Sequence, residues 1–193
     1  MVTLWWVRHG PTHCREMIGW TDAPADLSDS PRLARLARYL PAEAVVVSSD
    51  LCRAVATADA IQGSRRRLPH DPALREINFG AWEARSFAEI DAEDPDLCRQ
   101  YFSTPGSVAP PDGESWDALA ARTSKAADRL LRLVPSAPHV IAVAHFGPIL
   151  TQIRRARGCS AEAALAQKID PLSVTCLHWD GTAWQERAVN HHP

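Results

Sequence analysis

The sequence predicts an α/β protein, a three-layer α/β/α sandwich around a mostly parallel sheet. Short and nearly unbroken apolar runs occupy Thr3–Val7, Ala44–Val47 and Val140–Ala144, and polar residues, glycine or proline bound each run. Runs of this kind are typical of strands that are buried on both faces. Segments with helical periodicity lie between them. This alternation of strands and helices indicates parallel strands joined by helices.

The helices of this fold are predicted by apolar residues that recur every three or four positions. The segments are Arg32–Leu40, Leu51–Ile61 and Trp116–Leu133. In the first segment, Leu33 and Leu36 share one face of the helix. Each helix is therefore expected to pack an apolar face on the sheet.

A β-hairpin is expected near the C-terminal end of the sequence. Val174–Trp179 and Ala183–Val189 read as strands, and Asp180-Gly181-Thr182 separates them. A glycine in such a short connection suits a hairpin turn. These two strands are expected to close one side of the sheet.

The middle of the chain reads as an insertion over one end of the sheet. Prolines, acidic residues and short helical fragments such as Phe87–Ile90 occur between Phe79 and Pro111. We expect residues 80–112, approximately, to form this insertion, with short helices over the active site. The chain of 193 residues has no Gly/Ser linker and no shift in composition, so a single domain over 1–193 is expected.

Composition argues against several classes of partner. The formal net charge is −2, which gives no general attraction to nucleic acid. The apolar runs are too short to cross a bilayer, and no secretion signal is recognisable, so no membrane is expected and the cytoplasm is the expected location. The five cysteines are scattered without a C-x-x-C pair, which argues against a disulfide framework or a structural zinc site.

Polar residues follow the three predicted strands at the points where they end. The strands lead into Arg8-His9-Gly10, Ser48-Ser49-Asp50 and His145-Phe146-Gly147, and the second of these can cap a helix that carries Arg53 in its first turn. Ligands of open parallel sheets collect beyond the carboxyl ends of the strands. A single histidine at a strand end is more often structural than catalytic. Two histidines and two arginines at one edge together indicate a site.

This set of groups suits the chemistry of a phosphate monoester. Neutral imidazole beside fixed guanidinium groups can accept a dianionic phosphate without a metal, and imidazole is itself a nucleophile near neutral pH. The sequence lacks the cysteine-phosphatase loop, the P-loop, G-x-S-x-G and H-E-x-x-H. His9 and His13 are four positions apart, but Gly10 and Pro11 lie between them and disfavour a helical metal site. No metal and no organic cofactor are expected.

Five motifs resemble those of the histidine phosphatase superfamily, also called phosphoglycerate mutase-like. They are "VRHGPTH", "VVSSDLCRAVATADAI", "LREINFGAWE", "PDGESWDALAAR" and "VAHFGPI". The R-H-G tripeptide alone would be a weak signal. The five motifs together stand in the family's order and cover the chain from Thr3 to Pro148.

The resemblance assigns roles to the residues at the strand ends. It implies that His9 is the nucleophile that becomes phosphohistidine. It also implies that Arg8, Arg53 and His145 line the phosphate pocket. The backbone N–H of Phe146 would add a neutral hydrogen-bond donor to the same pocket.

The resemblance also implies a proton donor and a loop contact. Glu76 resembles the family's donor to the leaving oxygen, and Thr12 can contribute its hydroxyl at the edge of the first loop. The alternative for Glu76 is a surface salt bridge with Arg75. Glu83 is a second and weaker candidate for the acid.

Some positions depart from the family's pattern. Phe146 stands where a small residue is common, so it can narrow or cap the pocket. Pro11 replaces the more usual glutamate, and the segment from Arg15 to Asp22 is short, which leaves the role of Arg15 open. Three tryptophans could line a pocket for an aromatic or nucleoside-like leaving group, although packing is the more common role of such residues: Trp20, Trp82 and Trp116.

The function predicted from the sequence is hydrolysis of a small phosphorylated metabolite through a phosphohistidine, by a metal-independent phosphatase. Two alternatives stay open: phosphoglycerate mutase-type phosphoryl transfer, and a catalytically silent module that only binds phosphate. The short loop after the first motif and an acid at Glu76 favour the phosphatase. The oligomeric state and the physiological substrate stay open.

Overall fold

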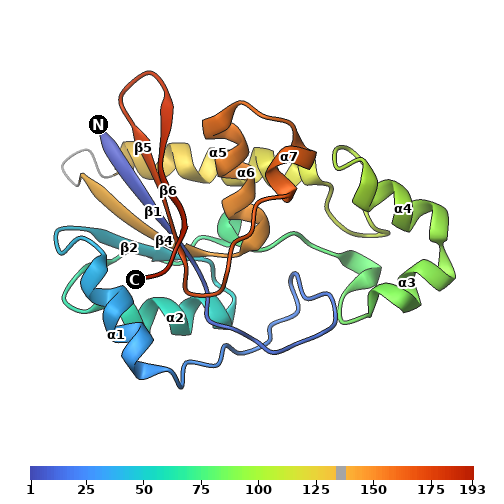
Figure 1. The fold of residues 1–193 in the computed structure, drawn as a ribbon, viewed down its shortest axis with the longest axis horizontal. Helices are drawn as coiled ribbons and strands as arrows, with labels where there is room; N and C mark the ends of the chain where they lie inside the picture. The colour runs from blue at the N-terminus through green and yellow to red at the C-terminus, as the bar shows by residue number, and fades with distance from the viewer. Residues whose placement is uncertain (134–137) are drawn as a thin grey trace.

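A six-stranded mixed sheet forms the centre of the protein (Figure 1). The computed structural model describes residues 1–133 and 138–193. The strand order is β3-β2-β4-β1-β5-β6; β3, β2, β4 and β1 are parallel neighbours, and the antiparallel β5 joins β1 to β6. The strands are β1 Val2–Arg8, β2 Val45–Ser48, β3 Arg66–Arg67, β4 His139–Ala144, β5 Val174–Trp179 and β6 Trp184–His191.

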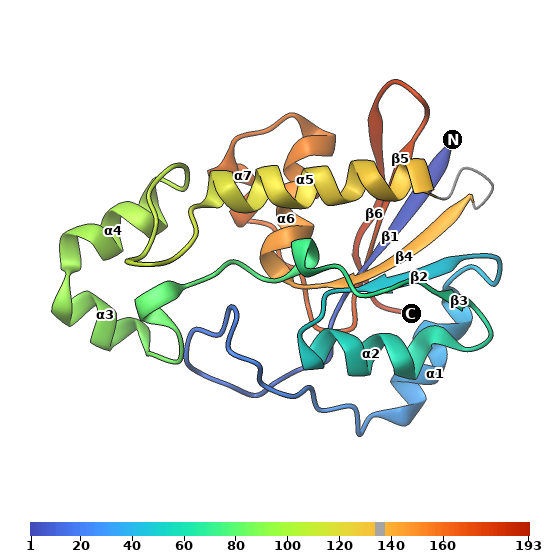
Figure 2. The same ribbon diagram turned by 180° about the vertical axis from the view of Figure 1, so that it is seen from behind.

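Helices cover both faces of this sheet, as Figures 1 and 2 show from opposite sides. They are α1 Ser30–Tyr39, α2 Cys52–Gln62, α3 Phe87–Glu93, α4 Pro95–Ser103, α5 Trp116–Leu133, α6 Phe146–Arg157 and α7 Ala161–Leu165. The first two pack on one face, while α5 and α6 pack on the other. The predicted three-layer α/β/α arrangement around a mostly parallel sheet is therefore confirmed.

The predicted elements are present, with small shifts at their ends. The helix expected at Trp116–Leu133 and the strand expected at Val174–Trp179 have the predicted bounds, and the fragment Phe87–Ile90 begins the longer α3. The strand β3, the helix α6 and the short α7 were not predicted. The two arginines of β3 carry no apolar pattern, and α6 follows directly on a strand end that reads as a loop.

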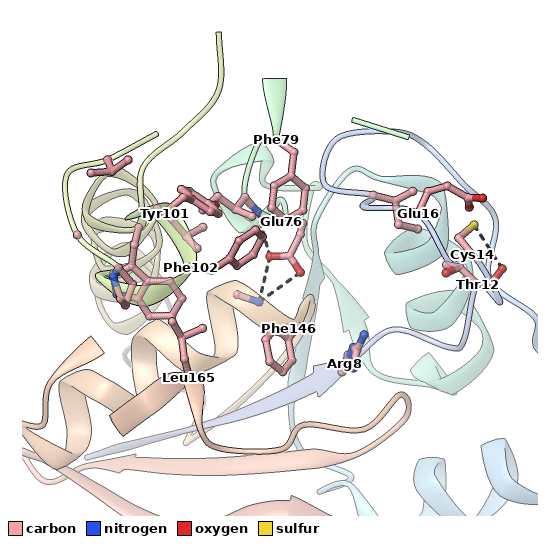
Figure 3. A pocket seen from close by; sticks show the side chains of 18 residues that line it. Arg8, Thr12, Cys14, Glu16, Glu76, Phe79, Tyr101, Phe102, Phe146 and Leu165 are labelled. Carbon is pink, nitrogen blue, oxygen red and sulfur yellow. Dashed lines mark hydrogen bonds between the residues drawn. The ribbon is translucent and has the colours of Figure 1, made fainter. Parts of the chain in front are cut away.

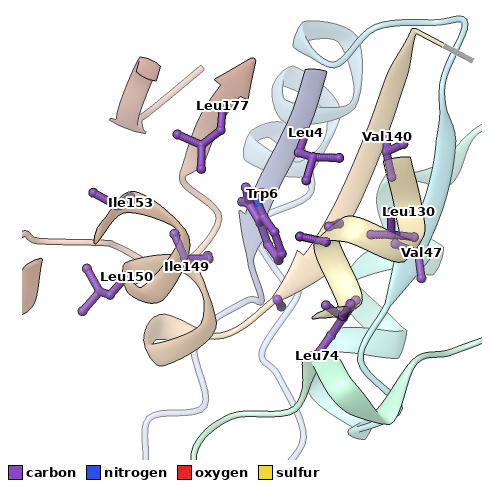
Figure 4. Close-up of a cluster of buried hydrophobic side chains, with 14 of the residues drawn as sticks. Leu4, Trp6, Val47, Leu74, Leu130, Val140, Ile149, Leu150, Ile153 and Leu177 are labelled. Atoms are coloured by element: carbon purple, nitrogen blue, oxygen red, sulfur yellow. The ribbon is translucent and has the colours of Figure 1, made fainter. Parts of the chain in front are cut away.

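The central strands are apolar on both faces because each face is covered by helices. On β4, Val140 and Ala142 belong to the cluster under α5 and α6, while Ile141 and Val143 belong to the cluster under α1 and α2. Figure 4 shows the first cluster, in which Trp6 of β1 lies completely buried. Successive side chains of a strand point to opposite faces, so a doubly covered strand has no polar alternation.

The insertion lies beside the carboxyl ends of the parallel strands and holds α3 and α4 (Figures 1 and 2). Ser86 and Glu89 form a capping box at the start of α3, and Asp94 caps the start of α4. Trp82, Ile90 and Cys98 form a small cluster of buried side chains of their own. The insertion therefore has its own local packing at the end of the sheet where a site was predicted.

The predicted C-terminal hairpin is also present. Asp180 accepts hydrogen bonds on Oδ1 from the N–H groups of Thr182 and Ala183, and Gly181 takes a φ of +111°, which favours glycine. The hairpin adds β5 and β6 to the free side of β1. In the described part of the chain, no helix is both long and apolar enough to cross a membrane.

Candidate active site

The ends of β1 and β4 bring the two predicted histidines together. Arg8 pairs with Ala144 in the parallel register, so the residues that follow each strand become neighbours. His9 donates its backbone N–H to the Ala144 carbonyl at 3.1 Å, and the rings of His9 and His145 have their centroids 4.9 Å apart. Both side chains are buried.

One backbone contact determines the tautomer of His9. Its Nδ1 atom lies 2.6 Å from the carbonyl oxygen of Gly10. Because a carbonyl can only accept, Nδ1 must carry the proton and Nε2 must carry the lone pair. Burial lowers the pKa of His9 to about 3, and the positive charges of Arg53 and Arg8 act in the same direction. The ring is therefore neutral at physiological pH, with an unprotonated Nε2.

His145 has the complementary arrangement. Arg53 donates from Nε to His145 Nδ1 at 3.2 Å, so the ring proton of His145 belongs on Nε2. Burial holds the pKa of His145 well below its usual value, and the neighbouring His9 and the positive charge of Arg53 act in the same direction. His145 Nε2 is buried and has no hydrogen-bond partner within the described residues. It is a buried donor available to a ligand.

Arg53 is itself fixed in place by backbone carbonyls. It lies in the first turn of α2 and is 1 % exposed. Its Nη1 donates to the Thr21 carbonyl at 2.8 Å and its Nη2 to the Gly19 carbonyl at 2.5 Å. The loop of residues 19–22 thereby holds the guanidinium against His145.

The predicted cap of α2 was wrong. The cap position is Leu51, and the side chain of Asp50 instead forms a two-pronged ion pair with Arg75, at 2.7 and 2.5 Å. Asp22, distant in sequence, accepts from the Cys52 N–H at 2.7 Å. The physical reason is that α2 begins beside the 19–22 loop, which supplies the acceptor.

Thr57 connects the first motif to α2, a role that sequence reasoning missed. Its hydroxyl accepts from the Gly10 N–H at 2.9 Å and donates to the Arg53 carbonyl at 2.7 Å. The signal was the threonine inside the second motif, one turn after Arg53, where both lie on one face of the helix.

Arg8 lies at the edge of the site. Its Nη1 donates to the Ile169 carbonyl at 2.6 Å, and its Nε is buried with no partner in the described chain. The guanidinium carbon lies 5.4 Å from the ring centroid of Phe146. Phe146 thus packs against the arginine that the sequence predicted to bind phosphate.

Glu76 is buried under the first turn of α6 and is not on the surface. It accepts from the backbone N–H of Gly147 and of Ile77, each at 3.0 Å from Oε1. A side chain at position 147 would collide with this carboxyl group, which explains the glycine there. Burial raises the pKa of Glu76 above its usual value. The alternative of a salt bridge with Arg75 is wrong.

Glu83 has a different environment from Glu76. It accepts hydrogen bonds from the backbone N–H groups of Gly19, Trp20, Thr21 and Phe79 and from the Thr21 hydroxyl. Burial acts to raise the pKa of Glu83, but these hydrogen bonds, led by the Thr21 hydroxyl, lower it overall. Glu83 is an ionised group that organises the loop holding Arg53.

Arg122 fixes the segment that carries Glu76, and sequence reasoning missed it as well. It pairs with Glu114 of the fourth motif and donates to the carbonyls of Ala73, Arg75 and Glu76 at 2.9 to 3.2 Å. Arg122 and Glu114 both lie in the fourth motif, but no sequence pattern connects Arg122 to its carbonyl acceptors, because these are backbone atoms about 46 to 49 residues away along the chain.

A cavity of about 340 Å³ opens beside these groups (Figure 3). Arg8, Thr12, Glu76 and Phe146 line it, while His9, Arg53 and His145 lie outside its lining. The insertion contributes α4 to the opposite wall.

Of the three tryptophans considered, Trp116 lines the cavity. Trp20 instead stacks on Arg75 and donates to the Glu76 carbonyl, and Trp82 packs in the insertion cluster. Arg15 is not part of the cavity lining. In the described ranges, no group of three or more His, Cys, Asp or Glu side chains could hold a metal ion.

Several curated relatives match most of the chain, and two of them are representative. The bifunctional protein Rv2228c of Mycobacterium tuberculosis is 30% identical over 200 residues, covering 95% of this chain and 52% of the relative. The chain therefore spans about half the length of that relative. A probable phosphoglycerate mutase GpmB of Proteus mirabilis is 25% identical over 190 residues, covering 95% of this chain and 88% of the relative.

Many solved structures share this fold, and two of them illustrate the similarity. Bacillus stearothermophilus YhfR superposes with a TM-score of 0.87 at 28% identity, covering 98% of this chain and 96% of that one. The mycobacterial glucosyl-3-phosphoglycerate phosphatase Rv2419c superposes with a TM-score of 0.84 at 26% identity, covering both chains completely.

The family model of the histidine phosphatase superfamily, branch 1, matches residues 4–192. This match spans nearly every residue that the five motifs and the site geometry involve. The chain belongs to the histidine phosphatase superfamily.

Proposed function

We propose that this protein hydrolyses a small phosphate monoester through a phosphohistidine formed on Nε2 of His9, without a metal. The contact between His9 Nδ1 and the Gly10 carbonyl carries the proposal, because it leaves the lone pair on Nε2. A neutral, oriented imidazole is the form in which histidine attacks phosphorus.

The phosphate would be held by donors that surround this nitrogen. Arg8 Nε and His145 Nε2 are both buried polar atoms without partners in the described chain, and a bound anion would satisfy them. The Phe146 N–H is the first of α6, where helix N–H groups have no intrahelical partner. Arg53 adds a fixed positive charge close by. Together these groups favour the charge that spreads over the phosphoryl oxygens in the transition state.

Glu76 would supply and then remove one proton. In the first step the His9 Nε2–P bond forms, the P–O ester bond breaks, and the leaving oxygen takes the proton of Glu76. In the second step water attacks the phosphohistidine and gives a proton to the Glu76 carboxylate, which releases inorganic phosphate and restores both groups. The raised pKa of Glu76 supports this role, since a carboxyl that stays protonated can act as the donor.

The relatives support a phosphate monoester as substrate and leave its identity open. One structural neighbour is a glucosyl-3-phosphoglycerate phosphatase, and one relative is named as a probable phosphoglycerate mutase. A mutase would use the same phosphohistidine and return the phosphoryl group to the sugar acid instead of to water. Product analysis distinguishes the two reactions.

Rapid acid-free quenching with a ³²P-labelled aryl phosphate tests the proposal. Label that is stable to base and labile to acid should appear on the tryptic peptide of residues 9–15. That peptide also holds His13, so His13→Asn is the matched control. We expect His13→Asn to keep the label and His9→Ala to lose it while keeping its circular dichroism spectrum. Label that survives in His9→Ala, or no label in a single turnover of the wild type, would refute the mechanism.

Two further arms complete the experiment. Prolonged treatment with EDTA should leave turnover unchanged, and loss of turnover that a divalent ion restores would contradict the metal-free step. With 3-phosphoglycerate, phosphorus NMR should show no 2-phosphoglycerate, whereas accumulation of 2-phosphoglycerate without inorganic phosphate would establish a mutase instead.

A further inference from the structure

The cavity beside Glu76 has one polar end and one apolar end. Arg8 and Thr12 lie toward the end of β1 and the first loop, and Glu76 lies between them and the rings of Phe79 and Phe102 (Figure 3). The rest of the wall is largely hydrocarbon: Phe79, Tyr101, Phe102, Val108, Trp116 and Leu165 are among its lining residues. A leaving group that extends away from the phosphate would therefore enter the apolar end.

The aromatic rings of this end come from the insertion and from the body of the protein. Tyr101 and Phe102 belong to α4, and their ring centroids lie 5.0 Å apart at nearly a right angle. Phe102 is 44% exposed although it lines the cavity, so its ring is accessible at the opening. Phe146 lies on the other side of Glu76 from Phe79, with its ring against the Arg8 guanidinium. A ligand placed between them would meet aromatic side chains on both sides.

The charges of the lining disfavour an acidic leaving group. Among the described residues that line the cavity, Arg8 is the only lysine or arginine, and the proposed phosphate site uses it. Glu16 contributes a carboxylate on the side of the first loop. No asparagine or glutamine belongs to the lining residues described. A second carboxylate on the substrate would lack a cationic partner among these lining residues.

We propose that the substrates are phosphate monoesters of aromatic or arylalkyl alcohols, whose ring binds between α4 and Phe146. This inference rests on the proposed phosphatase function and names the substrate class of that same site. The cavity of about 340 Å³ lies within the range of small-molecule pockets. Offset and edge-to-face packing against Tyr101, Phe102 and Phe146 would provide both burial and orientation for the ring.

Binding of uncleavable phosphonates tests this inference independently of turnover. Propylphosphonate, 3-phenylpropylphosphonate and 3-phosphonopropionate share a phosphonate and differ only in the far end of the chain. Calorimetric titration of the wild type should give tighter binding for the phenyl compound than for propylphosphonate, by between about tenfold and about a hundredfold, the effect of burying an aromatic side chain. The carboxylate compound should bind more weakly than propylphosphonate.

Two variants of the insertion locate the effect. Phe102→Ala should reduce the ratio of the affinities for 3-phenylpropylphosphonate and propylphosphonate by at least about threefold. The affinity for propylphosphonate itself should not change. Phe87→Ala is the matched control, because Phe87 is an exposed ring of the same insertion that packs on Phe102 but does not line the cavity. Phe87→Ala should keep the wild-type ratio of the two affinities.

Three results would overturn the inference. They are equal affinities for the phenyl and propyl compounds, tightest binding of the carboxylate compound, and equal losses in Phe102→Ala and Phe87→Ala. None of these results affects the phosphohistidine. Conversely, absence of label on His9 with a strong phenyl preference would refute the proposed reaction and leave the aromatic subsite standing.

Discussion

The two walls of the site are built in different ways. At the strand ends, His9, Arg53 and Glu76 are buried and each is held by a backbone atom: a carbonyl for the histidine, carbonyls for the arginine, an N–H for the glutamate. At the insertion, Tyr101 and Phe102 are held by contacts between rings, and Phe102 is 44% exposed. Backbone contacts fix side-chain geometry closely, whereas ring packing tolerates substitution. The reaction and the choice of substrate therefore depend on separable parts of the molecule.

The largest effect is expected at Arg53, because it touches both the strand ends and the 19–22 loop. Arg53→Met should lower kcat by about 10³-fold, since it removes a positive charge beside the phosphate and the donor that fixes the His145 tautomer. Steady-state kinetics on p-nitrophenyl phosphate measures the loss. A loss below about threefold would contradict the role of Arg53 in the phosphate pocket.

Arg65→Met provides the matched control for Arg53→Met. Like Arg53, Arg65 donates to backbone carbonyls, those of Ala37, Leu40 and Pro41 among them, but it makes no contact with His9 or His145. This variant should lower the melting temperature and leave kcat of the folded enzyme nearly unchanged. A comparable loss of kcat in both variants would show that loosened packing, and not the phosphate pocket, accounts for the effect.

A smaller and more selective loss is expected at Glu76. Glu76→Gln keeps the shape but cannot donate a carboxylic proton, so kcat on alkyl phosphates should fall by about 10²-fold and much less on p-nitrophenyl phosphate, whose leaving group needs no proton. Burial raises the pKa of Glu76, so the wild type should keep this carboxyl protonated at pH values where an ordinary glutamate is ionised. Its activity on alkyl phosphates should fall as the pH rises through the raised pKa. The variant should lack this basic limb.

Equal losses of Glu76→Gln on both substrates would contradict proton donation. They would indicate instead that the carboxyl only supports the turn at Gly147. Glu89 is an exposed glutamate of the insertion. The control is therefore Glu89→Gln, which should leave kcat on both substrates unchanged.

The sequence predicted the layers of the fold and the convergence of the strand ends, because apolar runs and their polar ends are local patterns. It did not predict α6, since His145-Phe146-Gly147-Pro148 reads as a loop, although proline is tolerated in a first helical turn.

Contacts between distant segments were not predictable either. The N–H group at the start of α2 is bound by Asp22, thirty positions away. Thr57 and Arg122 act on backbone atoms of distant segments, and no spacing rule connects such partners. Residue types were thus predictable, and the contacts that position them were not.

Glu83 is the clearest example of a residue whose type was predicted and whose contacts were not. The sequence suggested it as a second acid, whereas the structure surrounds it with N–H and O–H donors of the 19–21 loop and of Phe79. Glu83→Gln replaces one acceptor oxygen by an NH₂ group that faces those donors, so the loop that holds Arg53 should loosen. Small displacements of catalytic groups are costly, and we expect kcat to fall by about tenfold.

The substrate pattern separates the positioning role of Glu83 from proton donation. If Glu83 acts only through the loop and Arg53, Glu83→Gln should lose the same factor on alkyl and p-nitrophenyl phosphates and keep the basic limb of the pH profile. A positioning defect should also appear in Arg53→Met, so the double variant should be little worse than Arg53→Met alone, because the two changes act through one contact. If the kcat losses of the two single variants multiply in the double variant, or if the loss in Glu83→Gln is confined to alkyl phosphates, Glu83 takes a direct part in the chemistry. Either result would contradict the assignment of Glu76 as the acid and Glu83 as a positioning residue only.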